Sequence, residues 1–263
     1  WVPGFLPDLP EIRKELAQYY SSCHRCDETV GAVLHALDES GMADDTLVIF
    51  MSDNGMAFPF AKANCYLNST KTPFIAKWKG HIKEGSWNRE DYIAGVDYTA
   101  TILEALGLAD ELSGDGRSYL PLLLGEKQED RDMVFTQFNT TAMKGSYPMR
   151  CIQSQQYGYI FNAWSDGETF YKNESMSGLT YKAMKRAGEE DEELAERVRF
   201  FNYRCNEEFY DFKTDPDALH NLIHDPDQQE RIKIYKERLK NYMKESNDPV
   251  YPQFAEYLEK QQS

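Results

Sequence analysis

Asp53 and Asn54 offer two neighbouring oxygen donors of the kind that divalent cations bind, directly after a short apolar run, Thr46 to Met51. The run is rich in β-branched and aromatic side chains and ends in turn-forming residues. These features predict a strand buried on both faces, as in a parallel sheet. Ligand sites lie beyond the carboxyl ends of such strands, and Asp53 and Asn54 could share a calcium or magnesium ion there.

The same residues also have a purely structural interpretation. Asp-Asn-Gly is a good turn sequence, because Asn and Gly accept positive φ. From these residues alone a turn is favoured over a metal site by roughly two to one, given how often short motifs match by chance. Lys62 and Lys71 follow in the next loop. They could add two cations to an anion site, although an isolated lysine is usually a solvated surface residue.

Composition excludes some classes of protein. The 263 residues carry a net charge of −15, which argues against a nucleic-acid partner, since such binding needs a basic surface. A hydrophobic content of 41% is enough for a sizeable core. No apolar run approaches the length that crosses a bilayer, so we expect no membrane span.

The elements that would position these residues follow from local patterns. Apolar residues at alternating steps of three and four predict one long helix from Pro10 to about Leu37. Residues 46–51 and 73–78 read as strands, and Asp97 precedes a helix that Gly107 ends. Helix, short loop and buried strand form half of a βαβ unit, whose preceding strand is absent from this chain.

The pattern changes near Met133. Strand-like segments joined by turns predict an antiparallel sheet. Residues 226–245 predict an amphipathic helix with Ile232, Tyr235, Leu239 and Tyr242 or Met243 on its apolar stripe. We therefore expect an α/β protein with two domains: residues 1–130, a parallel or mixed sheet flanked by helices, and residues 131–263, an antiparallel lobe with a C-terminal helix.

Cys23 and Cys26 have the spacing of a redox or zinc half-site, but they lie within the long helical pattern and no second pair follows. We expect them to be seam residues of that helix and not metal ligands. Glu189 to Glu193 form an acidic run, which predicts a solvated face.

Six segments, taken in order, resemble the second half of the sulfatase family. They are Thr46–Gly55, Ala61–Tyr66, Lys71–Trp78, Val96–Leu103, Gly114–Pro121 and Glu208–Pro226, the last with Tyr-Asp-Phe-Lys-Thr-Asp-Pro and then Asn-Leu. Ser146–Arg150 and Asn247–Pro249 resemble the heparan N-sulfatase branch. The chain departs from that branch at Gln137–Thr140, which lacks the expected histidine.

The resemblance implies an alkaline phosphatase-like fold and a Ca²⁺ site in which Asp53 and Asn54 are the later pair of ligands. It implies that Lys62 holds a sulfate oxygen. Arg150 and Lys71 become candidates for substrate binding, although an Arg150 paired with an acidic residue is about as well supported in so acidic a chain. The substrate would be a sulfate ester or sulfamate of a glycosaminoglycan-like carbohydrate. The protein would be exported to the periplasm or medium, or lysosomal in a eukaryote.

The family's nucleophile is a formylglycine made from a C/S-x-P-x-R motif, and none of the five cysteines here fits that motif. The resemblance therefore implies that an N-terminal half of the same fold is missing, and that this chain alone is inactive with an incomplete calcium site. Two alternatives stay open. One is a phosphoryl hydrolase of the alkaline phosphatase superfamily, which would need paired metals held by Asp and His. The other is a non-catalytic anion-binding fragment.

Overall fold

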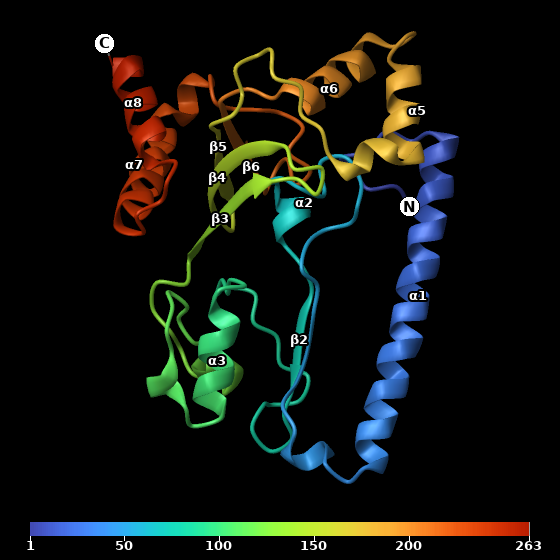
Figure 1. The fold of residues 1–263 in the computed structure, drawn as a ribbon, viewed down its shortest axis with the longest axis vertical. Helices are drawn as coiled ribbons and strands as arrows, with labels where there is room; N and C mark the ends of the chain where they lie inside the picture. The colour runs from blue at the N-terminus through green and yellow to red at the C-terminus, as the bar shows by residue number, and fades with distance from the viewer. Residues whose placement is uncertain (263) are drawn as a thin grey trace. The chain divides into compact units, whose positions relative to one another are not determined.

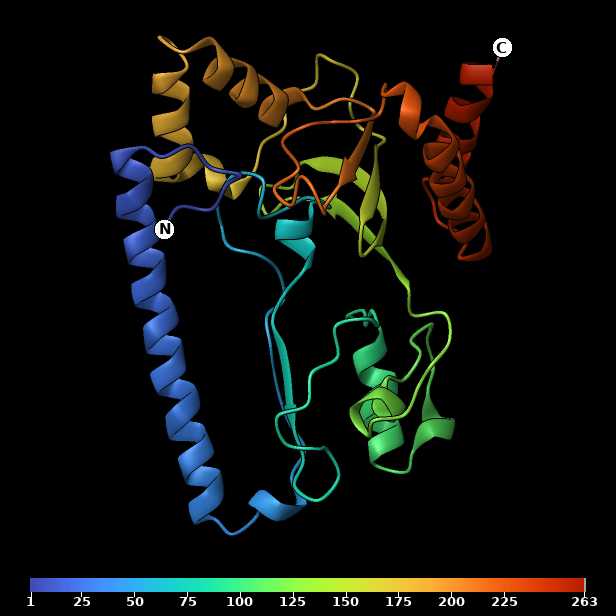
Figure 2. The same cartoon turned by 180° about the vertical axis from the view of Figure 1, so that it is seen from behind.

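The computed structural model describes residues 1–262 as a mixed α/β fold (Figures 1 and 2). Its contacts define two compact units: unit 1 combines residues 1–18, 54–71 and those from 135 onward, and unit 2 combines residues 19–53 and 72–134. This division differs from the expected 1–130 and 131–263. The start of the first helix and the loop 54–71 pack with the C-terminal lobe, so domain membership does not follow chain order.

The elements alternate irregularly along the chain. The helices are α1 (Pro10–Glu39), α2 (Leu67–Thr70), α3 (Asp97–Ala105), α4 (Leu120–Leu123), α5 (Leu179–Ala187), α6 (Glu192–Tyr203), α7 (Gln229–Glu245) and α8 (Tyr251–Gln262). The strands are β1 (Val48–Met51), β2 (Phe74–Lys77), β3 (Met133–Thr140), β4 (Ser146–Ser154), β5 (Tyr157–Asn162) and β6 (Glu207–Asp211). Four 3₁₀ turns are η1 (Ala43–Asp45), η2 (Ala109–Glu111), η3 (Glu174–Ser177) and η4 (Pro226–Gln228). No helix within residues 1–262 has the length and apolar character needed to span a bilayer.

Unit 1 is built on a four-stranded sheet of order β3-β4-β5-β6. β5 is antiparallel to both β4 and β6, which confirms the predicted antiparallel pairing in this lobe. Helices α7 and α8 lie on one side of the sheet, and α5 and α6 lie on the other (Figures 1 and 2). The predicted stripe of α7 is confirmed, with Ile232, Tyr235, Leu239 and Met243 buried. The acidic run before α6 is exposed, as expected.

Unit 2 contains the β1-β2 pair and a small helical cluster. Rings of Phe74, Tyr98 and Tyr119 pack edge-to-face and stacked, joining β2 to α3. Asp97, the first residue of α3, is buried and pairs with Arg131 at 2.5 Å. Asp97 also accepts a hydrogen bond from the backbone N–H of Arg117 at 2.9 Å, so one carboxylate ties the start of α3 to two later loops.

The prediction that residues 46–51 form a strand of a parallel sheet, buried on both faces, is wrong in this chain. β1 pairs with β2 in antiparallel register, Val48 opposite Lys77 and Met51 opposite Phe74. Met51 is 44% exposed, and Ile75 on β2 is 62% exposed. An apolar run shows which residues can be buried, but it does not supply the neighbours that bury them. In the described part of the chain, β1 has β2 as its one neighbouring strand, and Met51 and Ile75 remain largely exposed.

The predicted long helix is confirmed as α1, but only part of its predicted apolar stripe is buried. Ile12 and Leu16 are its buried side chains among the residues described. Cys23 and Cys26, expected at a packed seam, are exposed. Periodicity identifies the face that a partner could cover, and it does not by itself provide the partner.

Candidate functional site

Lys62 lies in a compact loop of unit 1, residues 54–71, which we call the Lys62 loop. Its two ends are joined by a hydrogen bond from the Gly55 N–H to the Ser69 carbonyl, at 2.9 Å. A Cβ added to Gly55 would lie 2.0 Å from the Asn68 carbonyl oxygen and 2.5 Å from that of Ala61. Only glycine allows the backbones to approach this closely, so Gly55 closes the base of the loop.

The residues around Lys62 are buried, and Lys62 itself is not. Phe58 to Tyr66 are all buried except Lys62, whose side chain is 31% exposed. Phe60 and Ala63, on either side of it, have φ of 66° and 60°, a region that residues with a Cβ rarely adopt. Strain of this kind persists only where surrounding contacts impose it, and it concentrates at functional positions. The loop therefore presents one cationic side chain from an otherwise buried turn.

Polar groups of the lobe hold this turn in place. The Tyr171 hydroxyl donates to the Ala63 carbonyl oxygen, and the Gln153 amide donates to that of Cys65 at 3.2 Å. Within the loop, Asn64 donates to the Lys62 carbonyl at 2.8 Å and accepts from the Tyr66 N–H at 3.0 Å. The backbone that follows Lys62 is thus fixed by two side chains distant in sequence, Tyr171 and Gln153.

Tyr66 is the deepest anchor. Its hydroxyl donates to Glu208 at 2.5 Å and accepts from the Arg204 guanidinium at 2.6 Å. Glu208 also accepts from Tyr210 at 2.5 Å and from the Asn162 amide at 2.7 Å. Burial raises the pKa of Tyr66 well above its ordinary value, with the Arg204 charge opposing that rise. The hydroxyl therefore stays protonated and bridges a buried cation to a buried anion.

Lys62 has one ionic neighbour in the described part of the chain. Its Nζ lies 3.7 Å from Oε1 of Glu174, whose side chain is 32% exposed. A pair of this length and exposure is worth little, about 0–1 kcal/mol. The amino group can therefore turn to a bound anion at small cost, which suits the expected contact with a sulfate oxygen.

The other candidates are placed as follows. Asp53 is exposed, and among the described residues its carboxylate makes no hydrogen bond or ion pair. Asn54 is half-buried and its amide donates to the Gly55 carbonyl at 3.0 Å. Lys71 is exposed at the end of α2. The three therefore stay predictions.

Arg150 is a buried structural residue by its geometry. It is 3% exposed, and its guanidinium grips both carboxylate oxygens of Asp248, at 2.5 and 2.9 Å. It also donates to Asn139 at 2.9 Å and to its neighbour's carbonyl, Met149, at 2.8 Å. All three nitrogens are engaged within the protein, so the structure favours the paired-arginine alternative over a substrate contact.

Asp53 and Asn54 are the right kind of ligands for a calcium ion, but they are too few to bind it alone. A carboxylate and an amide oxygen are the hard ligands that calcium prefers, but calcium takes six to eight. Within residues 1–262, no group of three or more His, Cys, Asp or Glu side chains is arranged to hold a metal. Asp53 and Asn54 can thus supply part of a coordination shell.

The thiols offer no nucleophile in this lobe. Burial raises the pKa of Cys65 and of Cys205 to about 12 and that of Cys151 well above its ordinary value. A thiol in this state is protonated near neutral pH and unreactive. This agrees with the absence of a formylglycine motif around any of them.

Sequence reasoning missed the anchors Glu174, Arg204 and Glu208. Glu208 carried a signal that could have been used: it is a charged residue directly before the aromatic pair Phe209 and Tyr210 in the strand Glu207–Asp211. A charge in a buried strand needs a partner, and the paired tyrosine and arginine provide it.

Comparison with known proteins agrees with this architecture. A solved structure described as a candidate sulfatase, YidJ, from Bacteroides fragilis superposes with a TM-score of 0.70 at 20% identity, covering 95% of this chain and 48% of that one. A model of the sulfatase family matches residues 3–108. The chain belongs to the sulfatase family.

Within the family, one branch stands out. A model described as N-sulphoglucosamine sulphohydrolase, C-terminal, matches residues 56–172. Human N-sulphoglucosamine sulphohydrolase is 30% identical over 262 residues, covering 94% of this chain and 51% of the human protein. A structure solved with its substrate D-glucosamine-2-N,6-O-disulfate shares the fold, with a TM-score of 0.62 at 22% identity over 85% of this chain and 39% of that one. The chain thus spans about half the length of the relatives it matches.

Proposed function

We propose that this chain supplies the Lys62 loop and the antiparallel lobe of a sulfatase that hydrolyses sulfate esters or sulfamates of a sulfated carbohydrate. The observation that carries the proposal is the presentation of Lys62 from a strained, deeply anchored turn. The similarity to N-sulphoglucosamine sulphohydrolase supports a glycosaminoglycan-like substrate, with N-sulfoglucosamine as the first sugar to test.

In this proposal Lys62 leaves its weak pair with Glu174 and binds a sulfate oxygen, so that its charge offsets the charge that grows there in the transition state. Asp53 and Asn54 contribute oxygen ligands to Ca²⁺, which when bound polarises the sulfate group. Further ligands and the formylglycine come from an N-terminal half of the same fold. The protein works outside the cytoplasm, in the periplasm or medium or in a lysosome.

The test uses the full-length protein and measures sulfate release from N-sulfoglucosamine. Replacing Lys62 by Met should lower kcat about 10²–10³-fold, the usual cost of losing a charge that stabilises a transition state. Lys213→Met, which removes an exposed lysine after β6, is the matched control and should leave the rate near wild type. An unchanged rate for Lys62→Met would overturn the assignment.

Two further assays separate the alternatives. Parallel assays of a sulfate ester and of the matching phosphate ester distinguish a sulfatase from a phosphoryl hydrolase. This chain expressed alone should give no turnover, because none of its cysteines lies in a C/S-x-P-x-R motif. The serine segment with that spacing, Ser146–Arg150, holds its arginine in a buried pair with Asp248. Recovery of the full-length protein in the cytoplasmic fraction alone would contradict the proposed location.

A further inference from the structure

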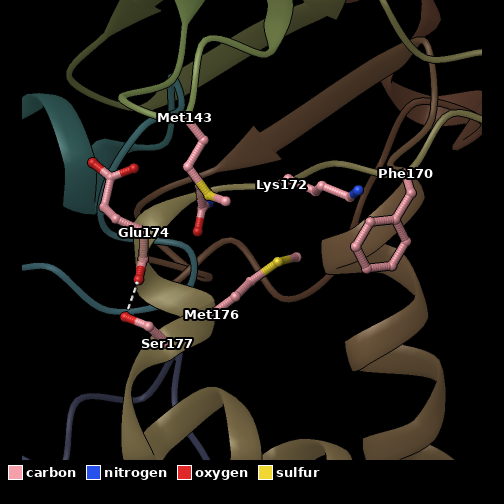
Figure 3. A pocket seen from close by; sticks show the side chains of 7 residues that line it. Met143, Phe170, Lys172, Glu174, Met176 and Ser177 are labelled. Carbon is pink, nitrogen blue, oxygen red and sulfur yellow. Dashed lines mark hydrogen bonds between the residues drawn. The ribbon is translucent and has the colours of Figure 1, made fainter.

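A pocket of about 390 Å³ opens in unit 1 between the β3-β4 turn and the segment that follows β5 (Figure 3). Its lining includes Met143 from the turn, and Phe170, Lys172, Asn173 and Met176 from the later segment. In Figure 3 the side chains of Met143, Met176 and Lys172 point toward the space in front of the Phe170 ring. Its volume falls within the range of small-molecule sites, about 300–1,000 Å³.

The lining has the composition of a site for an amphipathic ligand. Most of it is apolar, with an aromatic ring and two flexible thioethers that adapt to irregular shapes. Lys172 is exposed and brings one positive charge, in a protein whose net charge is −15. A small number of polar groups on an apolar wall is what orients a bound small molecule.

Asn173 fixes the turn that carries Glu174. It is 2% exposed, and its Oδ1 accepts from the Ser175 N–H at 3.0 Å and from the Ser175 hydroxyl at 2.6 Å, which fixes the orientation of the amide. Its Nδ2 is buried near the Tyr171 hydroxyl, which donates to Ala63 and keeps a lone pair that can accept from this amide. The Asn173 side chain therefore holds the turn in place and leaves ligand contacts to its neighbours.

Glu174 connects the pocket to Lys62. It contributes to the lining, and its carboxylate lies 3.7 Å from the Lys62 amino group. In Figure 3 that carboxylate points away from Met176 and the interior of the pocket. The pocket and Lys62 therefore lie on either side of one residue, close enough for one oligosaccharide to reach both.

We propose that this pocket binds the sugar adjoining the sulfated residue of an oligosaccharide substrate. The inference rests on the proposed function, since it takes Lys62 as the sulfate contact. The C–H face of a pyranose packs on Phe170 and the two methionines. A carboxylate or sulfate on that sugar pairs with Lys172. The ligand is thus an anionic sugar, such as a uronic acid.

The test is binding, which does not require turnover. Isothermal titration of the full-length protein gives the Kd of N-sulfoglucosamine and of a disaccharide of a uronic acid and N-sulfoglucosamine. We expect the disaccharide to bind more tightly, and Lys172→Gln to reduce its advantage about fivefold, as for an exposed ion pair. Lys185→Gln removes another exposed lysine, on α5 outside the lining, and should leave the ratio of the two Kd values unchanged.

Equal loss of affinity for both sugars in Lys172→Gln, or no loss for either, would overturn the pocket assignment. A disaccharide that binds no better than the monosaccharide would do the same, as would an uncharged aryl sugar that competes as well as the uronic acid. These results are independent of the rate assay. A protein that binds the disaccharide through Lys172 but releases no sulfate would contradict the proposed function and leave the pocket standing.

Discussion

The Tyr66 hydroxyl donates a hydrogen bond of 2.5 Å to Glu208, a residue 142 positions later in the chain. The same hydroxyl accepts from Arg204, so a single oxygen lies between two buried charges. Since the Lys62 loop ends in Tyr66 and α2, this contact determines how the loop sits on the sheet.

Replacing Tyr66 by Phe should destabilise the protein by about 1–3 kcal/mol, because Arg204 and Glu208 each lose a buried hydrogen-bond partner. Urea unfolding followed by circular dichroism measures the change. Tyr20→Phe alters a 42%-exposed ring on α1 and is the control, with little expected effect. Equal midpoints for the two variants would show that the hydroxyl does not anchor the loop.

Gly55→Ala tests the base of the loop. A Cβ here meets two carbonyl oxygens at 2.0 and 2.5 Å, so the backbones must separate, at a cost of about 1–3 kcal/mol or more. Gly31→Ala is the matched control, because in α1 a Cβ at that position meets nothing within 4 Å. An alanine in a helix interior should instead stabilise by about 0.5–1 kcal/mol. Opposite shifts of the two unfolding midpoints are the expected result.

Asp248→Asn tests whether Arg150 is structural. Removing one charge of a buried pair leaves the other uncompensated and should cost about 3–5 kcal/mol. Asp8→Asn is the control, since it breaks a pair with Arg13 in which both side chains are more than half exposed, and it should change the melting temperature little. If Asp248→Asn were as stable as wild type, Arg150 would again be a candidate for binding substrate.

Stability should fall at alkaline pH. The pKa of Cys65 and of Cys205 is about 12 in the folded protein, against an ordinary value near 9. Between these values the unfolded chain releases thiol protons that the native chain retains, so unfolding becomes easier as pH rises from about 9 to 12. Each thiol contributes a slope of about 1.4 kcal/mol per pH unit.

Urea titrations in reductant between pH 8 and 10.5 would measure this slope. A Cys65→Ser, Cys205→Ser double variant should make it smaller and leave the part that comes from Cys151 and the buried tyrosines. A stability that is constant over this range would contradict the burial of the two thiols. At neutral pH, a thiol reagent should modify the exposed Cys23 and Cys26 in the native protein, and the buried Cys65 and Cys151 only after unfolding.

Local patterns predicted the elements whose packing is local. The stripe of α7 was found because a period of 3.6 residues reports one face of a helix directly. The antiparallel strands β4 to β6 were found as strand-like segments joined by turns. The long helix α1 was predicted for the same reason. How much of the apolar face of α1 is buried could not be predicted, because burial depends on which other elements pack against that face.

The candidate site divides in the same way. Lys62, Asp53 and Asn54 could be picked out by residue type and resemblance. The contacts that hold Lys62 in place could not, because Glu174 and Glu208 are more than a hundred positions away and no local period links them to it. The predicted parallel strand failed because an apolar run does not specify the direction of its neighbour.

The assembly of unit 1 from three separate stretches of chain has a consequence for synthesis on the ribosome. At roughly 5–20 residues per second, Glu208 emerges roughly 7–28 s after Tyr66. During that interval the rings of Phe58, Phe60 and Tyr66 in the Lys62 loop have no sheet to pack on, and they are open to chaperones and to aggregation. A ribosome that stalls anywhere before β6 would release a chain whose Lys62 loop cannot close.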